Sequence, residues 1–143
     1  MTAMDPGTRL VTRYLAEAVE TASPAVRLMM LFDRLELDLR RASDGFESGD
    51  LELINDGLVH AQEILFILRA TLRGDLWEGA PRLGALYDFL HGELLHANVA
   101  KDRTRMTAAM EMIGQLAAAW RQAAANASGE APEREHAGAG DLA

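Results

Sequence analysis

Apolar residues recur at alternating intervals of three and four positions along much of the chain, a spacing that places side chains on one face of an α-helix. One such seam consists of Leu51, Ile54, Leu58, Ala61, Leu65, Leu68 and Leu72. A second consists of Met106, Ala109, Ile113, Leu116, Trp120 and Ala123. Segments in which apolar and polar residues alternate, as in strands, are nearly absent. Seams of this kind pack antiparallel helices together, so the pattern predicts an all-α fold.

Residues that commonly cap or begin helices divide this pattern into five predicted helices. Ser23 is expected to cap a helix that has Pro24 at its first position, where the missing N–H costs nothing. Asp50 and Asp102 are expected to cap two further helices, and Pro81 to begin another. The predicted helices span residues 9–20, 24–42, 51–73, 81–100 and 103–126. A turn that includes Gly45 and Gly49 is predicted at residues 43–50, and a loop at residues 74–80.

The predicted organisation is one helical domain between two terminal segments. Residues 1–20 form an N-terminal segment with a short helix, and residues 21–126 form the bundle domain. Residues 127–143 are mostly Gly, Ala and Glu with a single Leu, a composition that predicts a disordered tail. The predicted fold is therefore all-α: an antiparallel four-helix bundle with an additional short N-terminal helix and a disordered C-terminal tail.

Composition narrows the possible partners. The 143 residues carry a formal net charge of −8, and the 14 basic residues are scattered along the chain rather than clustered. Nucleic acids and acidic lipids are bound by clustered cations, so neither is expected as a partner. No apolar run approaches the roughly 18 residues that a membrane helix needs. Since the N-terminus also lacks the pattern of a secretory signal, a cytoplasmic location without membrane insertion is expected.

Candidate catalytic chemistry is sparse. The chain has no cysteine, which excludes disulfides, thiol nucleophiles and thiolate metal sites. Glu93 and His96 form an E-x-x-H pair, but a di-iron bundle needs two such pairs, and the other one, Glu133 with His136, lies in the predicted tail. No metal site or cofactor is therefore expected.

Two histidines, His60 and His91, lie in predicted helices and raise the possibility of a histidine phosphotransfer module. That chemistry needs a lysine near the histidine, and the one lysine of the chain, Lys101, is not near His60 in the sequence. No serine–histidine–aspartate order or phosphate-binding glycine loop stands out either. The chain is therefore not expected to be an enzyme.

Two of the predicted helices carry more apolar side chains than one stripe requires. Beyond the row of Leu28, Leu31, Leu35 and Leu39, the additional residues are Met29, Met30, Phe32 and Leu37, and on the next helix Leu53, Ile64, Phe66 and Ile67. A helix in a small bundle needs about one apolar stripe. The surplus indicates a central helix, a homodimer interface, or a groove that holds a partner helix.

Five short stretches follow one another in an order that is typical of one family. Residues 21–24 (T-A-S-P) precede a Leu/Met-rich run that ends in Phe-Asp at residues 28–33, and residues 61–65 are A-Q-E-I-L. Residues 86–102 contain L-Y-D-F followed by Leu, Ala-Asn and Asp, and residues 116–120 close with L-x-x-A-W. Over about residues 14–124, the sequence thus resembles the flagellar secretion chaperones of the FliS family.

This resemblance implies a cytoplasmic helical bundle that binds the C-terminal segment of flagellin in apolar grooves. Such a chaperone keeps that segment from polymerising before type III secretion, and it is not an enzyme and needs no cofactor. Whether other flagellar export or regulatory proteins also bind is left open. So is the alternative of a homodimeric structural or regulatory bundle with no flagellin client.

The residues and the resemblance together give two sets of candidate positions. The groove candidates are Tyr14, Met29, Met30, Phe32, Leu53, Ile64, Leu65, Ile67, Leu68 and Tyr87. The positions that match structural motifs of the family are Ser23, Pro24, Leu31, Asp33, Leu86, Asp88, Asn98, Asp102 and Trp120.

Several of these positions carry more specific expectations. Asn98 is expected to make a polar contact at a helix end. Tyr14 and Trp120 are expected at the end of the bundle core, and Tyr14 is also placed to cover an empty groove. Asp33 and Asp88 are expected to form buried hydrogen bonds between helices or ion pairs with Arg27, Arg34 or Arg82.

Overall fold

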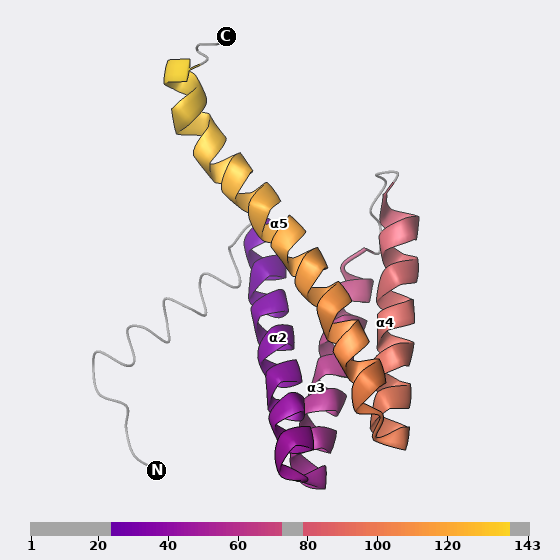
Figure 1. Cartoon of the computed structure of the whole chain (residues 1–143). Coiled ribbons are helices and arrows are strands. Elements are labelled where there is room, and N and C mark those ends of the chain that lie inside the picture. Colours follow the sequence, from indigo (N-terminus) through magenta and orange to yellow (C-terminus); the bar gives the residue numbers. More distant parts are fainter. Residues whose placement is uncertain (1–23, 73–78, 138–143) are drawn as a thin grey trace, which may run out of the picture.

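The computed structural model describes the backbone of residues 24–72 and 79–137, and side chains within residues 25–72 and 79–126. This part of the chain is entirely helical, without strands, and it consists of four helices (Figure 1). They are α2 (Pro24–Ser48), α3 (Leu51–Ala70), α4 (Ala80–Ala100) and α5 (Arg103–Ala137). The predicted short helix at 9–20, Tyr14 and Ser23 lie outside the described residues, as does most of the predicted loop at 74–80.

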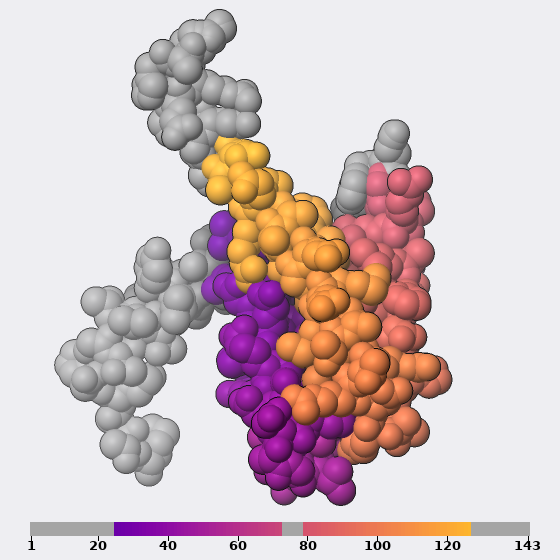
Figure 2. Space-filling model, in the orientation of Figure 1, coloured from indigo at the N-terminus to yellow at the C-terminus, as the bar shows by residue number. Residues whose placement is uncertain are grey.

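Each helix packs against the next one in the chain, and α5 returns to pack against α2. The α5 helix begins beside the C-terminal end of α4 and crosses obliquely toward the N-terminal end of α2 (Figure 1). Figure 2 shows the same crossing on the surface, with α2 on one side of α5 and α4 on the other. Because of this crossing, α5 leaves the N-terminal half of α4 progressively less covered.

Four of the predicted helix starts are confirmed. The Asp50 side chain accepts a hydrogen bond from the backbone N–H of Leu53 at 3.0 Å, and Asp102 accepts one from Arg105 at 3.1 Å. Pro81 lies in the first turn of α4, where its missing N–H has no helical partner to lose. α2 begins at Pro24 as predicted.

The end of α2 differs from the prediction: the helix continues past Ala42 to Ser48, and the expected turn shrinks to Gly49 and Asp50. Gly45 is a close-packing position inside the helix, because a Cβ there would lie 2.8 Å from Cγ1 of Ile54. Gly49, with φ of 72°, is the residue that ends the helix. The Asp50 N–H then donates to the Gly45 carbonyl at 2.8 Å, as in a Schellman motif.

Two other helix ends also differ. α3 ends at Ala70 rather than near Arg73, and the Thr71 hydroxyl donates to the Leu68 carbonyl at 2.6 Å. α5 runs to Ala137 rather than ending near Asn126, and the disorder of the predicted tail stays a prediction. Residues 138–143 lie outside the described part.

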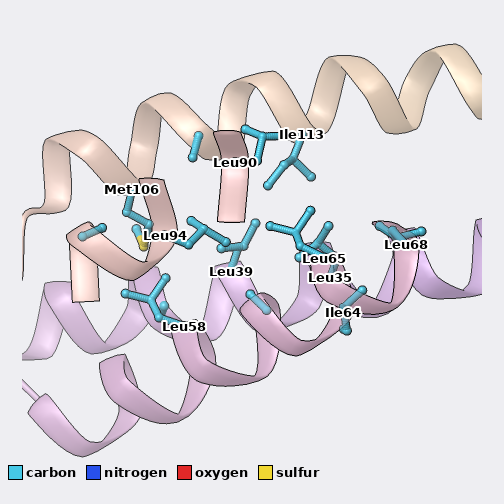
Figure 3. Packing of buried hydrophobic residues seen from close by; sticks show 14 of the residues in the cluster. Leu35, Leu39, Leu58, Ile64, Leu65, Leu68, Leu90, Leu94, Met106 and Ile113 are labelled. Atoms are coloured by element: carbon cyan, nitrogen blue, oxygen red, sulfur yellow. The ribbon is translucent and has the colours of Figure 1, made fainter. Parts of the chain in front are cut away.

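The core forms where the predicted seams meet between the four helices. Leu39, Leu94 and Met106 point into the space between the helices, from α2, α4 and α5 (Figure 3). The α3 seam is buried from Ile54 to Leu68, with Leu51 exposed at its start. It comprises Ile54, Leu58, Ala61, Leu65 and Leu68.

The α5 seam is buried at Met106, Ala109 and Ile113 and then shifts to Ala117. Leu116 and Trp120 are only partly buried. The shift follows from the oblique crossing, which turns this face of α5 away from the core and leaves Leu116 and Trp120 beside α4.

α2 and α3 approach closely around a buried carboxylate. A Cβ on Gly57 would lie 2.6 Å from the Asp38 carbonyl oxygen, so only glycine fits there without a shift. The Asp38 side chain, 2% exposed, is paired with Nδ1 of His60 on α3 and with Nε of Arg34 at 3.3 Å. His60, considered above for phosphotransfer, is thus an interhelical partner of Asp38.

Candidate partner-binding grooves

An almost wholly apolar hollow lies between α4 and α5, where the two helices diverge. We call it the α4–α5 groove. Its volume is about 450 Å³, and Arg82 is the one charged residue among those that line it. The lining residues are Gly79, Arg82, Leu83, Leu86, Leu116, Ala119, Trp120 and Ala123.

Two buried polar atoms lie together beside this groove, and neither has another hydrogen-bond partner among the described residues. They are the hydroxyl oxygen of Tyr87 on α4 and Nε1 of Trp120 on α5. Burial raises the pKa of the Tyr87 hydroxyl to about 12, and the nearby Trp120 indole acts in the opposite direction. Buried polar groups are nearly always hydrogen-bonded in folded proteins. The pair therefore marks a place where a bound polar group would gain hydrogen bonds.

The opposite side of α5 is tied to α2 by an arginine. Nη2 of Arg121 donates to Glu36 at 2.5 Å and to Asp33 at 2.6 Å. Both hydrogen bonds hold the pKa of the Arg121 guanidinium above its ordinary value. The pairing joins α5 to α2 at the level of Trp120, on the side of α5 away from the groove.

A second hollow lies over α3 and α4, and we call it the α3–α4 surface. It has a volume of about 500 Å³ and is lined by Val59, Gln62, Glu63, Phe66, Ile67 and His91. Phe66 is 69% exposed, although it is one of the largest apolar side chains. A smaller hollow adjoins it, shares Phe66 and His91, and also contacts Arg69 and Asp88. Arg69 Nε donates to Asp88 Oδ1 at 3.1 Å there.

The family model described as "Flagellar protein FliS" matches residues 7–127. The chain belongs to the FliS family. A curated relative, the "Flagellar secretion chaperone FliS" of Bacillus subtilis (strain 168), is 30% identical over 112 residues, which cover 78% of this chain and 84% of the relative. A second, of the same name, from Salmonella typhimurium (strain LT2), is 34% identical over 113 residues, with 78% and 84% covered.

The groove candidates from the sequence separate into three groups in this FliS-family chain. Core positions are Phe32, Ile64, Leu65, Leu68 and Tyr87, all buried. Met29, Met30 and Leu53 are partly exposed, and Ile67, 45% exposed, lines the α3–α4 surface. Tyr14 lies outside the described residues. Among the core positions, Leu65 and Tyr87 also line the smaller hollow beside the α3–α4 surface.

The α4–α5 groove is formed largely by residues that the sequence analysis did not select. Leu83, Ala119 and Ala123 were not among the groove candidates, and Leu86 and Trp120 were selected for their motif positions. The seam from Met106 to Ala123 includes three lining residues, but its departure from the core depends on the helix crossing. The sequence did single out Phe66, because this apolar residue lies off the α3 seam.

The motif positions have clear structural roles where they are described. Leu31 packs partly buried against the core, and Leu86 and Trp120 line the α4–α5 groove. The partners of Asp33 and Asp88 are Arg121 and Arg69, which lie on other helices. The arginines near Asp33 and Asp88 in the sequence suggested different pairs, because spacing along one helix carries no information about contacts between helices.

Asn98 makes the helix-end polar contacts that were predicted. Its Nδ2 donates to Oδ1 of Asn55 on α3 at 2.9 Å, and its Oδ1 accepts from Lys101 Nζ at 2.6 Å. Lys101 has a left-handed backbone, with φ of 51°, and ends α4. These contacts join the C-terminal end of α4 to the first turns of α3.

The described residues offer little for metal chemistry or membrane insertion. Within residues 25–72 and 79–126, whose side chains are described, no three histidine or acidic side chains come together as metal ligands. Glu93 of the E-x-x-H pair lies 3.7 Å from Nε of Arg105. In the same part of the chain, no helix combines the length and the apolar character needed to cross a membrane.

Proposed function

We propose that this protein is a flagellar export chaperone that acts in the cytoplasm. It binds the C-terminal segment of flagellin and keeps that segment from polymerising before type III secretion. Family membership over most of the chain and two relatives named as flagellar secretion chaperones support this function. Its action is binding rather than catalysis.

The observation that carries the proposal is the α4–α5 groove, and we propose that a helix of the client lies in it. Helix-in-groove recognition uses apolar side chains at intervals of three and four residues. Leu83, Leu86 and Leu116 supply a matching apolar wall. A polar oxygen on the client helix would accept a hydrogen bond from Trp120 Nε1, which within the described residues has no partner other than the neighbouring Tyr87 hydroxyl.

Occupation of this groove explains how polymerisation is prevented. The apolar stripe of a free amphipathic helix is the surface by which it associates with other subunits. Once this stripe is buried against α4 and α5, it is removed from water and from competing partners. Because the client segment becomes helical only on binding, the loss of its conformational entropy lowers the affinity. The complex therefore stays reversible.

Calorimetric titration with a synthetic peptide of the same organism's flagellin C-terminus, together with circular dichroism of the mixture, tests this function. We expect saturable binding and more helix than the two components show separately. No heat and no added helix would contradict the chaperone function. A sedimentation series over protein concentration then addresses the homodimer, because self-association without peptide binding supports that alternative.

A further inference from the structure

The α3–α4 surface has no role in the function proposed above, although it is as large as the α4–α5 groove. We propose that it is a second docking site, which binds a basic amphipathic helix of another protein. The site differs from the client groove in position and in chemistry. It is built on α3, whereas the client groove lies between α4 and α5.

The apolar part of the site is a stripe on one face of α3. Val59, Phe66 and Ile67 are 40%, 69% and 45% exposed, and their spacing of seven and eight residues places them on the same side of the helix. Large apolar side chains gathered in this way are typical of protein interaction sites rather than of ordinary surface. The width of one helix face favours another helix as the partner.

The charges along the same stripe are acidic. Glu52, Asp56 and Glu63 follow one another at intervals of four and seven residues, and Glu63 lines the hollow itself. None of these three carboxylates takes part in an ion pair with another described residue within 4.0 Å. Arg69, the one arginine of α3 in the described part, is already paired with Asp88. A partner with lysine or arginine beside its apolar face therefore complements this surface.

A buried hydrogen-bond donor in the site sets a further requirement for the partner. Nε2 of Gln62 is buried among the lining residues and has no hydrogen-bond partner among the described residues. A partner helix that covers the surface can accept a hydrogen bond from Gln62 Nε2. It needs an acceptor for this within its apolar face, such as an asparagine, glutamine or serine oxygen. The expected partner is thus a helix with an apolar stripe, one polar acceptor in that stripe, and basic flanks.

The first test is calorimetric titration with a synthetic helical peptide that has a leucine stripe with one asparagine and lysine flanks. A second peptide with glutamate in place of lysine is the control. We expect saturable one-to-one binding of the basic peptide alone, both to the free protein and to protein already saturated with the flagellin peptide. Competition between the two peptides would overturn the proposal, because it would mean that they share a site.

Two pairs of variants locate the binding. Glu63→Lys reverses a charge in the site. Glu111→Lys changes the net charge of the protein by the same amount, but at an exposed position on α5 outside the site. We expect Glu63→Lys to weaken binding about three- to tenfold and Glu111→Lys to leave it nearly unchanged. Equal losses in both variants would mean non-specific attraction to an acidic protein and would contradict a defined site.

Phe66→Ala tests the apolar contact, and Val99→Ala is its control. Both residues are exposed, at 69% and 78%, but Val99 does not line the hollow. Removing the phenyl ring should weaken binding of the basic peptide by about tenfold or more, since this ring has the most surface to bury. If Phe66→Ala binds as well as Val99→Ala while both remain folded, the α3–α4 surface is not the docking site.

Discussion

Nη2 of Arg121 on α5 lies 2.6 Å from Oδ1 of Asp33 on α2, and so joins two helices through residues 88 positions apart in the sequence. The same nitrogen also reaches Glu36. These bonds are made one residue after Trp120, which lines the α4–α5 groove. The ion pairs that join α5 to α2 therefore lie at the level of the groove between α5 and α4.

Arg121→Ala should loosen the C-terminal half of α5 with little loss of global stability. Ion pairs between exposed side chains contribute at most about 1 kcal/mol, and Arg121 is partly exposed. We expect faster amide hydrogen exchange in α5 around Trp120 and weaker binding of the flagellin peptide. Hydrogen exchange followed by mass spectrometry resolves the segment.

The matched control for this prediction is Arg103→Ala, which removes another α5–α2 ion pair. Arg103 Nη2 lies 2.6 Å from Glu47 Oε1, at the end of α5 away from the groove. This variant should leave exchange around Trp120 and peptide affinity unchanged. If both variants behave alike, Arg121 has no specific influence on the groove.

Gly57→Ala should destabilise the protein by about 1–3 kcal/mol, the usual cost of forcing an extra methyl group into a packed interface. Its Cβ would lie 2.9 Å from the backbone nitrogen of Ala42, and backbone atoms cannot move aside easily. Denaturant unfolding followed by circular dichroism measures the difference. The distortion should be local to α2 and α3.

Gly114→Ala is the counterpart, because a Cβ there meets nothing within 4 Å and the residue lies inside α5. Alanine is favoured over glycine in a helix by about 1 kcal/mol, so this variant should be more stable than the natural protein. Equal effects of the two substitutions would mean that the close approach at Gly57 does not limit packing.

The Tyr87 hydroxyl should ionise near pH 12 rather than near pH 10. A pKa that is higher in the folded than in the unfolded state favours folding fully below pH 10, and this contribution is lost as the pH rises through 12. The difference corresponds to roughly 3 kcal/mol at the alkaline limit. Tyrosinate absorbance measured against pH in a Tyr14→Phe variant reports Tyr87 alone. Ionisation near pH 10 in the folded protein would contradict its burial.

The helix starts were predictable because their causes are local. Asp50 and Asp102 cap helices through hydrogen bonds to residues three positions ahead, and such chemistry is visible in the sequence. Gly45 was mistaken for a turn residue because its reason is a contact with Ile54 on the next helix. Short-range patterns carry no record of such contacts.

The groove was harder to predict than the core for the same reason. The apolar seam of α5 was evident, but it does not indicate where the helix departs from α4. Only the crossing of α5 over α2, held in part by Arg121, turns Leu116 and Trp120 from core positions into lining residues. The surplus of apolar residues pointed to a groove but did not indicate its position.

The most direct test of the account is the affinity of the flagellin C-terminal peptide for two variants of α5, measured side by side by calorimetry. Ala119→Lys places a charge in the α4–α5 groove next to Arg82, whereas Ala108→Lys makes the same change on an exposed turn away from it. Both residues are exposed, so both variants should fold. We predict that Ala119→Lys weakens binding at least about tenfold and Ala108→Lys leaves it unchanged. Unchanged binding by a folded Ala119→Lys variant would contradict the claim that the client helix lies between α4 and α5.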